Sequence, residues 1–150
     1  MAKAMASFPS ALFLREAEVR RGLELMFAGQ AELARAVAPI LAAANLGRPH
    51  QRALYYIGRQ PDQTVGALLG KLGVTKQSLN RTLTELLERG LVEARVGRDD
   101  RRQRLLRLTE SGRALEGELF EAMRERLASA YAKAGQQAVG GFWSVLEGLS

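Results

Sequence analysis

The sequence contains no cysteine, and its only histidine is His50. The missing cysteine excludes disulfides, thiolate metal sites and thiol-based redox sensing within this chain. A single histidine cannot complete a catalytic triad or a multi-histidine metal site. The sequence also has no nucleophile–base pair and no glycine-rich phosphate loop. We therefore expect a protein that is not an enzyme and that binds no metal and no cofactor.

Long hydrophobic runs are missing as well. No stretch of 18 or more residues is continuously apolar, so the sequence predicts no membrane span and no membrane partner. The first ten residues contain Lys3 but no apolar core followed by a cleavage site, so we expect a cytoplasmic protein without a signal peptide. A length of 150 residues, with 47% hydrophobic and 25% charged residues, is typical of one soluble domain.

Apolar residues recur at helical spacing in several segments, which predicts a mainly α-helical fold. These segments lie at residues 11–45, 49–60, 66–72, 76–90, 109–134 and 136–149. We expect Pro39 to kink or break the first helix, because proline removes one backbone hydrogen bond. Two short strands at 91–96 and 102–108 flank a turn at 97–100. The predicted order is four helices, a β-hairpin and two further helices.

Basic residues outnumber acidic ones, and the net charge of +6 indicates a polyanionic partner. Ribosomal, membrane-surface and DNA-binding proteins share such a balance, so the placement of the charges has to decide between them. The helix at 66–72, the tight turn at Gly73–Val74 and the longer helix at 76–90 form a helix-turn-helix arrangement. Thr75 is a natural N-cap for the second helix, which can enter the major groove of double-stranded DNA.

The second helix of this pair has two unlike sides. Leucines at spacings of three and four residues face the expected core, and polar residues share the other side. Arg81 suits a guanine edge, whereas Gln77 or Asn80 suits an adenine edge. A polar face with two positive charges is also typical of a solvated surface helix. The expected DNA-binding residues are Thr75, Lys76, Gln77, Ser78, Asn80, Arg81 and Thr84.

The hairpin that follows is rich in arginine, which suits both phosphates and the narrow minor groove. Charge on an edge hairpin can also serve to block aggregation, but lysine or glutamate would serve that purpose equally well. A basic hairpin directly after a helix-turn-helix makes a winged helix, and the pair is more specific than either part. The expected DNA-binding residues of the hairpin are Arg95, Arg98, Asp100, Arg101, Arg102 and Arg104.

At these residues the chain resembles the MarR family of bacterial transcriptional regulators. The family's wing signature is D-x-R, then a strand, then L-T-x-x-G, which is matched here by residues 100–102 and 108–112. Within the family, the sequences VTKQSLNR and RVGRDDRRQRLLRLTESG are closest to the PetP-like members. One departure is Gly66, where the family usually has a serine or glutamate that starts the third helix.

The resemblance implies an obligate homodimer in which each chain presents one winged helix. It implies that Arg102 reaches the minor groove and that Asp100 holds the wing by pairing with arginine. It covers nearly the whole chain, as a single domain at 1–150. The ranges 11–45 and 109–149 would dimerise, and the range 46–108 would bind a pseudo-palindromic operator with half-sites about 34 Å apart.

The terminal helices themselves also favour a dimer, because they have more apolar surface than one small domain can cover. Core packing within one chain is the alternative explanation for these residues. The expected interface residues are Leu12, Val19, Leu23, Leu119, Leu127, Phe142, Trp143 and Leu146.

Many members of the family release DNA when a small, often phenolic ligand binds. The candidate lining residues are Met26, Phe27, Gln30, His50, Arg52 and Tyr55. The alternative explanation is that they are simply core or hinge residues. PetP-like members are also associated with two-component response regulators. An alternative function is therefore a winged-helix interaction module that partners a response regulator without binding DNA.

Overall fold

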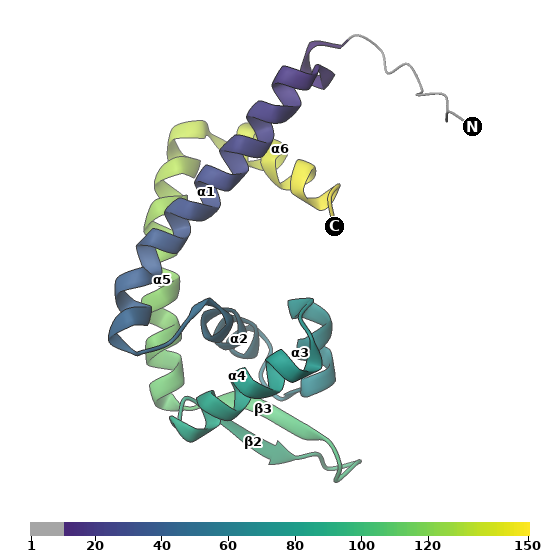
Figure 1. The fold of residues 1–150 in the computed structure, drawn as a ribbon, viewed down its shortest axis with the longest axis vertical. Helices are drawn as coiled ribbons and strands as arrows, with labels where there is room; N and C mark the ends of the chain where they lie inside the picture. The colour runs from purple at the N-terminus through teal and green to yellow at the C-terminus, as the bar shows by residue number, and fades with distance from the viewer. Residues whose placement is uncertain (1–10) are drawn as a thin grey trace, which may run out of the picture. The chain divides into compact units, whose positions relative to one another are not determined.

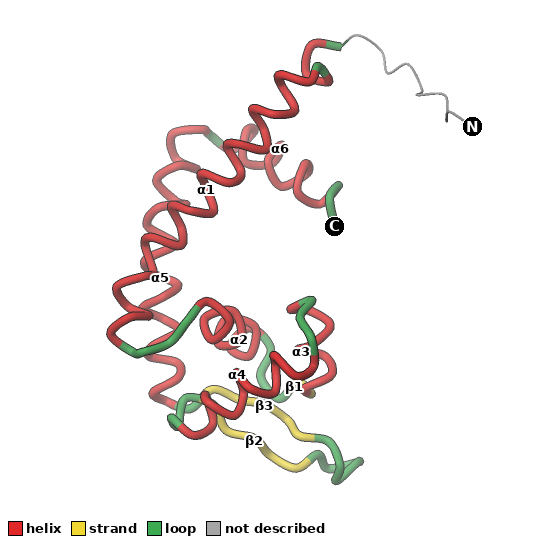
Figure 2. Tube along the Cα trace, viewed as in Figure 1, coloured by secondary structure: helices red, strands yellow, loops and turns green. Residues whose placement is uncertain are grey.

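The computed structural model describes residues 11–150, drawn as a ribbon in Figure 1 and by secondary structure in Figure 2. A 3-10 turn at Leu12–Leu14 precedes the first helix. The helices are α1 (Glu16–Ala43), α2 (Arg48–Arg59), α3 (Val65–Leu72), α4 (Lys76–Glu88), α5 (Glu110–Ala134) and α6 (Gln136–Glu147). The strands are β1 (Gln63–Thr64), β2 (Val92–Val96) and β3 (Arg104–Leu108). This order confirms the predicted mainly α fold with four helices, a hairpin and two further helices.

The chain divides into two compact units, one ending at Arg35 and the other running from Ala36 to Ser150. The first unit, over its described residues, is one helical segment with large apolar side chains on its surface. Leu12, Val19, Leu23 and Phe27 are between 48% and 65% exposed. By length and composition alone, α1 is the one described helix that could cross a membrane, a test that core helices of soluble proteins also pass.

The expected break at Pro39 is absent, because α1 continues without interruption from Glu16 to Ala43. Val37 and Leu41 lie on either side of the proline and are only 1% and 5% exposed. Their burial holds both sides of the proline against the core, which compensates for the hydrogen bond that proline cannot make. The helix ends at Ala43, two residues before the predicted limit, and Asn45 then takes a left-handed conformation with a φ of 52°.

The core of the second unit surrounds α2. Ala53, Leu54 and Ile57 of this helix are completely buried, and α2 contacts α3, α4, α5 and β3. Leucines from these elements fill the space between them, so the helix-turn-helix and the hairpin form one packed body. The other buried apolar residues are Val37, Leu41, Leu46, Leu68, Leu72, Leu79, Leu83, Leu86, Val92, Leu106, Leu108 and Leu119.

Local caps set the ends of the helix-turn-helix. The Thr64 hydroxyl accepts a hydrogen bond from the Ala67 N–H at 3.1 Å, so α3 begins without needing a serine or glutamate at Gly66. Gly73 ends α3 with a φ of 63°, a left-handed conformation that glycine adopts at no steric cost. As predicted, Thr75 caps α4 by accepting from the Ser78 N–H at 3.1 Å.

The sheet has a third strand that the sequence pattern did not predict. The strand order is β1-β3-β2, and both pairs are antiparallel, with Gln63 opposite Leu106 and Val92 opposite Leu108. β1 has two residues, too few to show an alternating pattern. Its Gln63 is only 4% exposed, and the side-chain amide donates to the carbonyls of Tyr56 and Gln60. These bonds fix the base of the hairpin to the end of α2.

The hairpin meets α5 at a close contact that requires glycine. The Thr109 N–H donates to the Leu91 carbonyl, and the Thr109 hydroxyl donates to the Gly90 carbonyl at 2.6 Å. The same hydroxyl accepts from the Gly112 N–H at 3.1 Å, which caps α5. A Cβ on Gly112 would lie 1.9 Å from the Leu91 carbonyl oxygen. The final glycine of the L-T-x-x-G motif is therefore a packing requirement.

We predict that Gly112→Ala lowers the free energy of unfolding by about 3 kcal/mol, because the added methyl group must push two backbone segments apart. The matched control is Gly117→Ala on the same helix, where a Cβ would meet nothing within 4 Å. That change should stabilise the protein by about 0.5–1 kcal/mol through helix propensity. Urea unfolding of both variants at one protein concentration measures the difference, and equal stability would refute the packing argument.

Candidate nucleic-acid interface

The N-terminal half of α4 presents an open polar surface. All seven residues predicted to read DNA from this helix are exposed, while Leu79, Leu83 and Leu86 on the opposite side are 5% exposed or less. Lys76 and Arg81 make no hydrogen bond or ion pair with any other described residue. Their charges are therefore free to meet an external anion. Thr82 also lies on the buried side of α4, which the sequence did not predict. Its hydroxyl donates a hydrogen bond to the Ser78 carbonyl at 3.1 Å.

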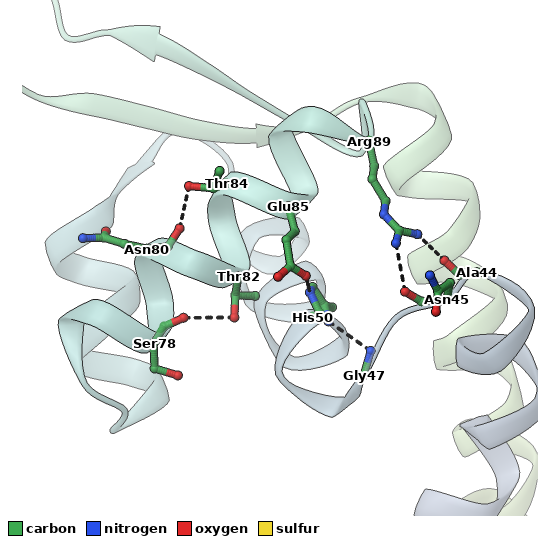
Figure 3. Close-up of polar contacts among 10 residues, drawn as sticks. All are labelled: Ala44, Asn45, Gly47, His50, Ser78, Asn80, Thr82, Thr84, Glu85 and Arg89. Atoms are coloured by element: carbon green, nitrogen blue, oxygen red, sulfur yellow. Dashed lines mark hydrogen bonds and ion pairs between the residues drawn. The ribbon is translucent and has the colours of Figure 1, made fainter.

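Two polar residues of this surface differ in what they can still bond. Figure 3 shows the Thr84 hydroxyl donating to the Asn80 carbonyl at 2.8 Å, so its proton is already engaged. The Asn80 side-chain amide points away from this bond. An amide offers both a donor and an acceptor, the pattern that an adenine edge complements. Asn80 is thus better equipped than Thr84 for hydrogen bonds to a base.

Hydrogen bonds within the tip of the hairpin fix its shape. Gly97 N–H donates to the Gln103 carbonyl at 3.0 Å, and Gln103 N–H donates to the Asp100 carbonyl at 3.1 Å. Asp100 Oδ1 accepts from both the backbone N–H and the Nε of Arg102, at 3.0 and 3.3 Å. The Arg102 side chain nevertheless remains 92% exposed. The carboxylate therefore orients a guanidinium group that stays open to solvent.

The hairpin arginines do not all face outward. Arg98, Arg101, Arg102 and Arg104 are exposed at the tip and the start of β3, and Arg95 lies 3.6 Å from Glu93. Arg107 instead belongs to the base of the hairpin, where its Nε and Nη2 donate to the two carboxylate oxygens of Asp62 at 3.2 and 2.5 Å. Arg107 lies in the same arginine-rich hairpin, but the structure assigns it to an ion pair within the chain.

This ion pair joins the turn before β1 to β3. Asp62 takes a left-handed conformation with a φ of 64°, and its N–H donates to the Leu106 carbonyl at 2.8 Å. The hydrogen bonds from the Arg107 guanidinium lower the pKa of Asp62 below its ordinary value near 3.8. The pair was not predictable because its partners are 45 residues apart.

The candidate ligand residues lie in both units. Met26, Phe27 and Gln30 belong to the first unit. In the second, His50 bonds the Gly47 N–H and Glu85, and Tyr55 packs edge-to-face on Tyr56 with ring centroids 5.4 Å apart. Arg52 lines an open pocket of about 280 Å³ between α2 and α4, and its Nη2 donates to the Leu72 carbonyl. The other residues lining this pocket are Arg48, Pro49, Leu72, Val74, Ser78, Leu79 and Thr82.

The candidate dimer residues also separate into two groups. Leu119 is only 1% exposed within one chain, so the structure places it in the core and corrects its assignment to an interface. Phe142 and Trp143 on α6 are 44% and 51% exposed, and Leu127 is 37% exposed. The Trp143 indole donates to the Tyr131 hydroxyl at 3.0 Å, which holds α6 against α5. Leu146 is half-buried.

Comparison with known proteins agrees with this geometry. A model of the MarR family matches residues 44–103. The chain is 50% identical over 138 residues to the HTH-type transcriptional regulator PetP of Rhodobacter capsulatus, covering 92% of this chain and 83% of that protein. It resembles the structure of NadR in complex with 4-hydroxyphenylacetate, with 26% identity, a TM-score of 0.73 and coverage of 85% and 89%. Streptococcus pneumoniae FabT, solved with DNA, shares the fold at 22% identity and a TM-score of 0.67, with coverage of 91% and 100%.

A short helix, a tight turn, an open polar helix and a basic hairpin in one packed unit define a winged helix-turn-helix protein. The extent of the sequence identity then settles the family. The chain belongs to the MarR family of DNA-binding transcriptional regulators, as the wing signature predicted.

The Asp62–Arg107 pair predicts a pH-dependent stability. Because the pKa of Asp62 is lowered in the folded state, its contribution is present above about pH 4 and is lost as the pH falls through the folded value. Asp62→Asn, which tolerates the left-handed conformation, should lower the Tm slightly near pH 7, by an amount that shrinks as the pH falls below about 4. Thermal melts of this variant and of Asp99→Asn, which changes an unpaired wing carboxylate, test the assignment. A pH-independent difference would contradict it.

Proposed function

We propose that the protein is a sequence-specific regulator that binds a pseudo-palindromic operator as a homodimer, with residues 1–150 as a single domain. The observation that carries this proposal is the exposed guanidinium of Arg102, held by Asp100 in the same packed unit as the open polar half of α4. Two cationic elements with fixed shapes can then meet adjacent grooves of one duplex. The regulators FabT and CouR were solved bound to DNA with this fold.

In this proposal, α4 and the hairpin perform different tasks. The N-terminal half of α4 enters the major groove, where Gln77, Asn80 and Arg81 contact base edges. The hairpin arginines contact phosphates and the minor groove, which supplies affinity with little sequence information. Thr84 contributes its methyl group, because its hydroxyl proton is engaged by the helix backbone. Thr75, Lys76 and Ser78 at the start of the helix bond phosphates.

In the proposed homodimer, a second copy of the chain packs against the exposed apolar side chains of the terminal helices. Val19 and Leu23 on α1, and Phe142 and Trp143 on α6, are exposed to a degree that soluble monomers rarely tolerate in clusters. Two-fold association covers the same surface on both copies. The same association would also cover the apolar side chains of α1, whose length and composition alone would suit a membrane span.

A small aromatic acid is the proposed effector class. The structure of NadR was solved in complex with 4-hydroxyphenylacetate, and NadR is 26% identical in sequence to this chain. The pocket between α2 and α4 contains Arg48 and Arg52, whose positive charges suit a carboxylate. No finding supports the alternative of a protein-interaction module that partners a response regulator without DNA.

The DNA assignment predicts a steep salt dependence. Affinity for a selected operator should fall by about 10³-fold or more between roughly 50 and 200 mM salt, because phosphate contacts release counterions. Arg102→Ala should weaken binding about 10-fold or more and reduce the salt slope by about 2, because the dimer loses one arginine contact in each half-site. Fluorescence anisotropy measures both quantities.

Arg124→Ala is the charge-matched control, because it removes an arginine that pairs with Glu121 on α5. It should retain the affinity of the wild type. A flat salt response, or an Arg102→Ala variant as tight as the control, would show that the wing does not bind DNA.

The dimer assignment predicts that Phe142→Asp yields a monomer, because it places a charge in the proposed apolar interface. Val96→Asp introduces the same charge at a hairpin residue that is 64% exposed, and should leave the dimer intact. Light scattering coupled to size-exclusion chromatography distinguishes the two states. A dimeric Phe142→Asp protein would place the interface elsewhere.

A further inference from the structure

The connection between α1 and α2 is bonded to the C-terminal half of α4. The Arg89 guanidinium donates to the carbonyls of Ala44 and Asn45, and His50 Nε2 lies 2.5 Å from Glu85 Oε2. Figure 3 shows these side chains reaching from α4 to the connection and the start of α2. We name this set of contacts the α4 clamp. It lies entirely within the second unit.

The hydrogen-bonding pattern defines the protonation state that the clamp uses. Gly47 N–H donates to His50 Nδ1 at 3.0 Å, so Nδ1 carries no proton. The ring proton is then on Nε2 and is donated to Glu85. One neutral imidazole thus caps α2 and bonds α4 at the same time, with a side chain that is only 14% exposed. A glutamine at position 85 would keep an acceptor for this proton, whereas an alanine would not.

Arg89 bonds the part of the connection that directly follows α1, where a positive charge is favourable. Ala44 and Asn45 directly follow the last residue of α1, next to the negative end of the helix dipole. A guanidinium group bonds the carbonyls of both residues and complements this charge. Although exposed, this contact is directional, because the planar donor fork must match two fixed acceptors.

The clamp and the DNA-reading residues lie on successive turns of one helix. Arg81, Glu85 and Arg89 are spaced by four residues, so their side chains follow one another along the same side. The leucines of α4 hold the helix against the core, but apolar contacts have no directional preference and allow small rotations. Hydrogen bonds at Glu85 and Arg89 oppose rotation and sliding of the helix. They therefore fix the orientation of the helix from which Arg81 projects.

We infer that His50, Glu85 and Arg89 are positioning residues that set the angle of α4 relative to the end of α1, and thereby the half-site spacing that the protein accepts. This inference rests on the proposed function, because spacing has a meaning only for a dimer on two half-sites. It assigns His50 a bonded role in place of the ligand contact expected from the sequence.

The test compares operator duplexes that differ in spacing. A duplex selected by the wild-type protein from a random library is remade with one base pair added or removed between the half-sites. The measured quantity is the ratio of affinities for the selected and the altered spacing. Glu85→Ala and Arg89→Ala should lower this ratio roughly 10-fold, the size expected for one lost hydrogen bond to a charged group.

Two variants serve as controls. Glu85→Gln keeps an acceptor for His50 and should retain the wild-type ratio. Glu88→Ala removes an equal charge from the same helix at an exposed residue, and should also retain it. If Glu85→Ala does not fold, Arg89→Met preserves the aliphatic stem and gives the same comparison.

The outcomes separate the inference from the proposed function. If Glu85→Ala and Arg89→Ala lower the Tm but leave the ratio unchanged, these residues only stabilise the fold and the inference is wrong. If Glu85→Gln behaves like Glu85→Ala, the His50 bond is not the cause and the inference is equally overturned. If the wild-type protein binds no duplex at any spacing, the proposed function fails and the inference fails with it.

Discussion

The burial of one short helix is the constraint on which the structure depends. Ala53, Leu54 and Ile57 of α2 are completely inaccessible to solvent, and three helices and one strand that follow α2 in the sequence pack against it. Each large apolar side chain buried in this way contributes about 1.5–3 kcal/mol. Because α3, α4, α5 and β3 share this support, the helix-turn-helix and the hairpin keep a fixed relation to each other. A winged helix needs that relation to contact adjacent grooves.

Hydrogen bonds and ion pairs then orient the side chains and helices that the apolar core holds together. Asp100 orients Arg102, Asp62 fixes Arg107, and Glu85 accepts a hydrogen bond from His50. Exposed ion pairs contribute little to the free energy of unfolding. Their value here is geometric, since each one restricts the direction of a long side chain or of a helix. Arg107 thus maintains the base of the hairpin, whereas the exposed Arg102 remains available to an anion.

The terminal helices differ from this body because their apolar surfaces are left open in one chain. Leu119 is covered by the chain itself, whereas Leu23 and Trp143 are about half exposed. A pattern of apolar residues at helical spacing does not distinguish these two situations. Only the tertiary packing shows which leucines are already buried and which ones remain exposed in one chain.

The sequence by itself determined the elements and their order, because the signals that set them are local. Thr75 and Thr109 cap helices through bonds to residues three positions on, and Gly73 marks its turn by its own conformation. The wing signature likewise identified the family, and the exposed face of α4 followed from its spacing. The tertiary structure alone decided β1, the Asp62–Arg107 pair, the α4 clamp and the burial of Leu119. Those features join residues that are tens of positions apart, and such partners are chosen by packing, which no local pattern of residues records.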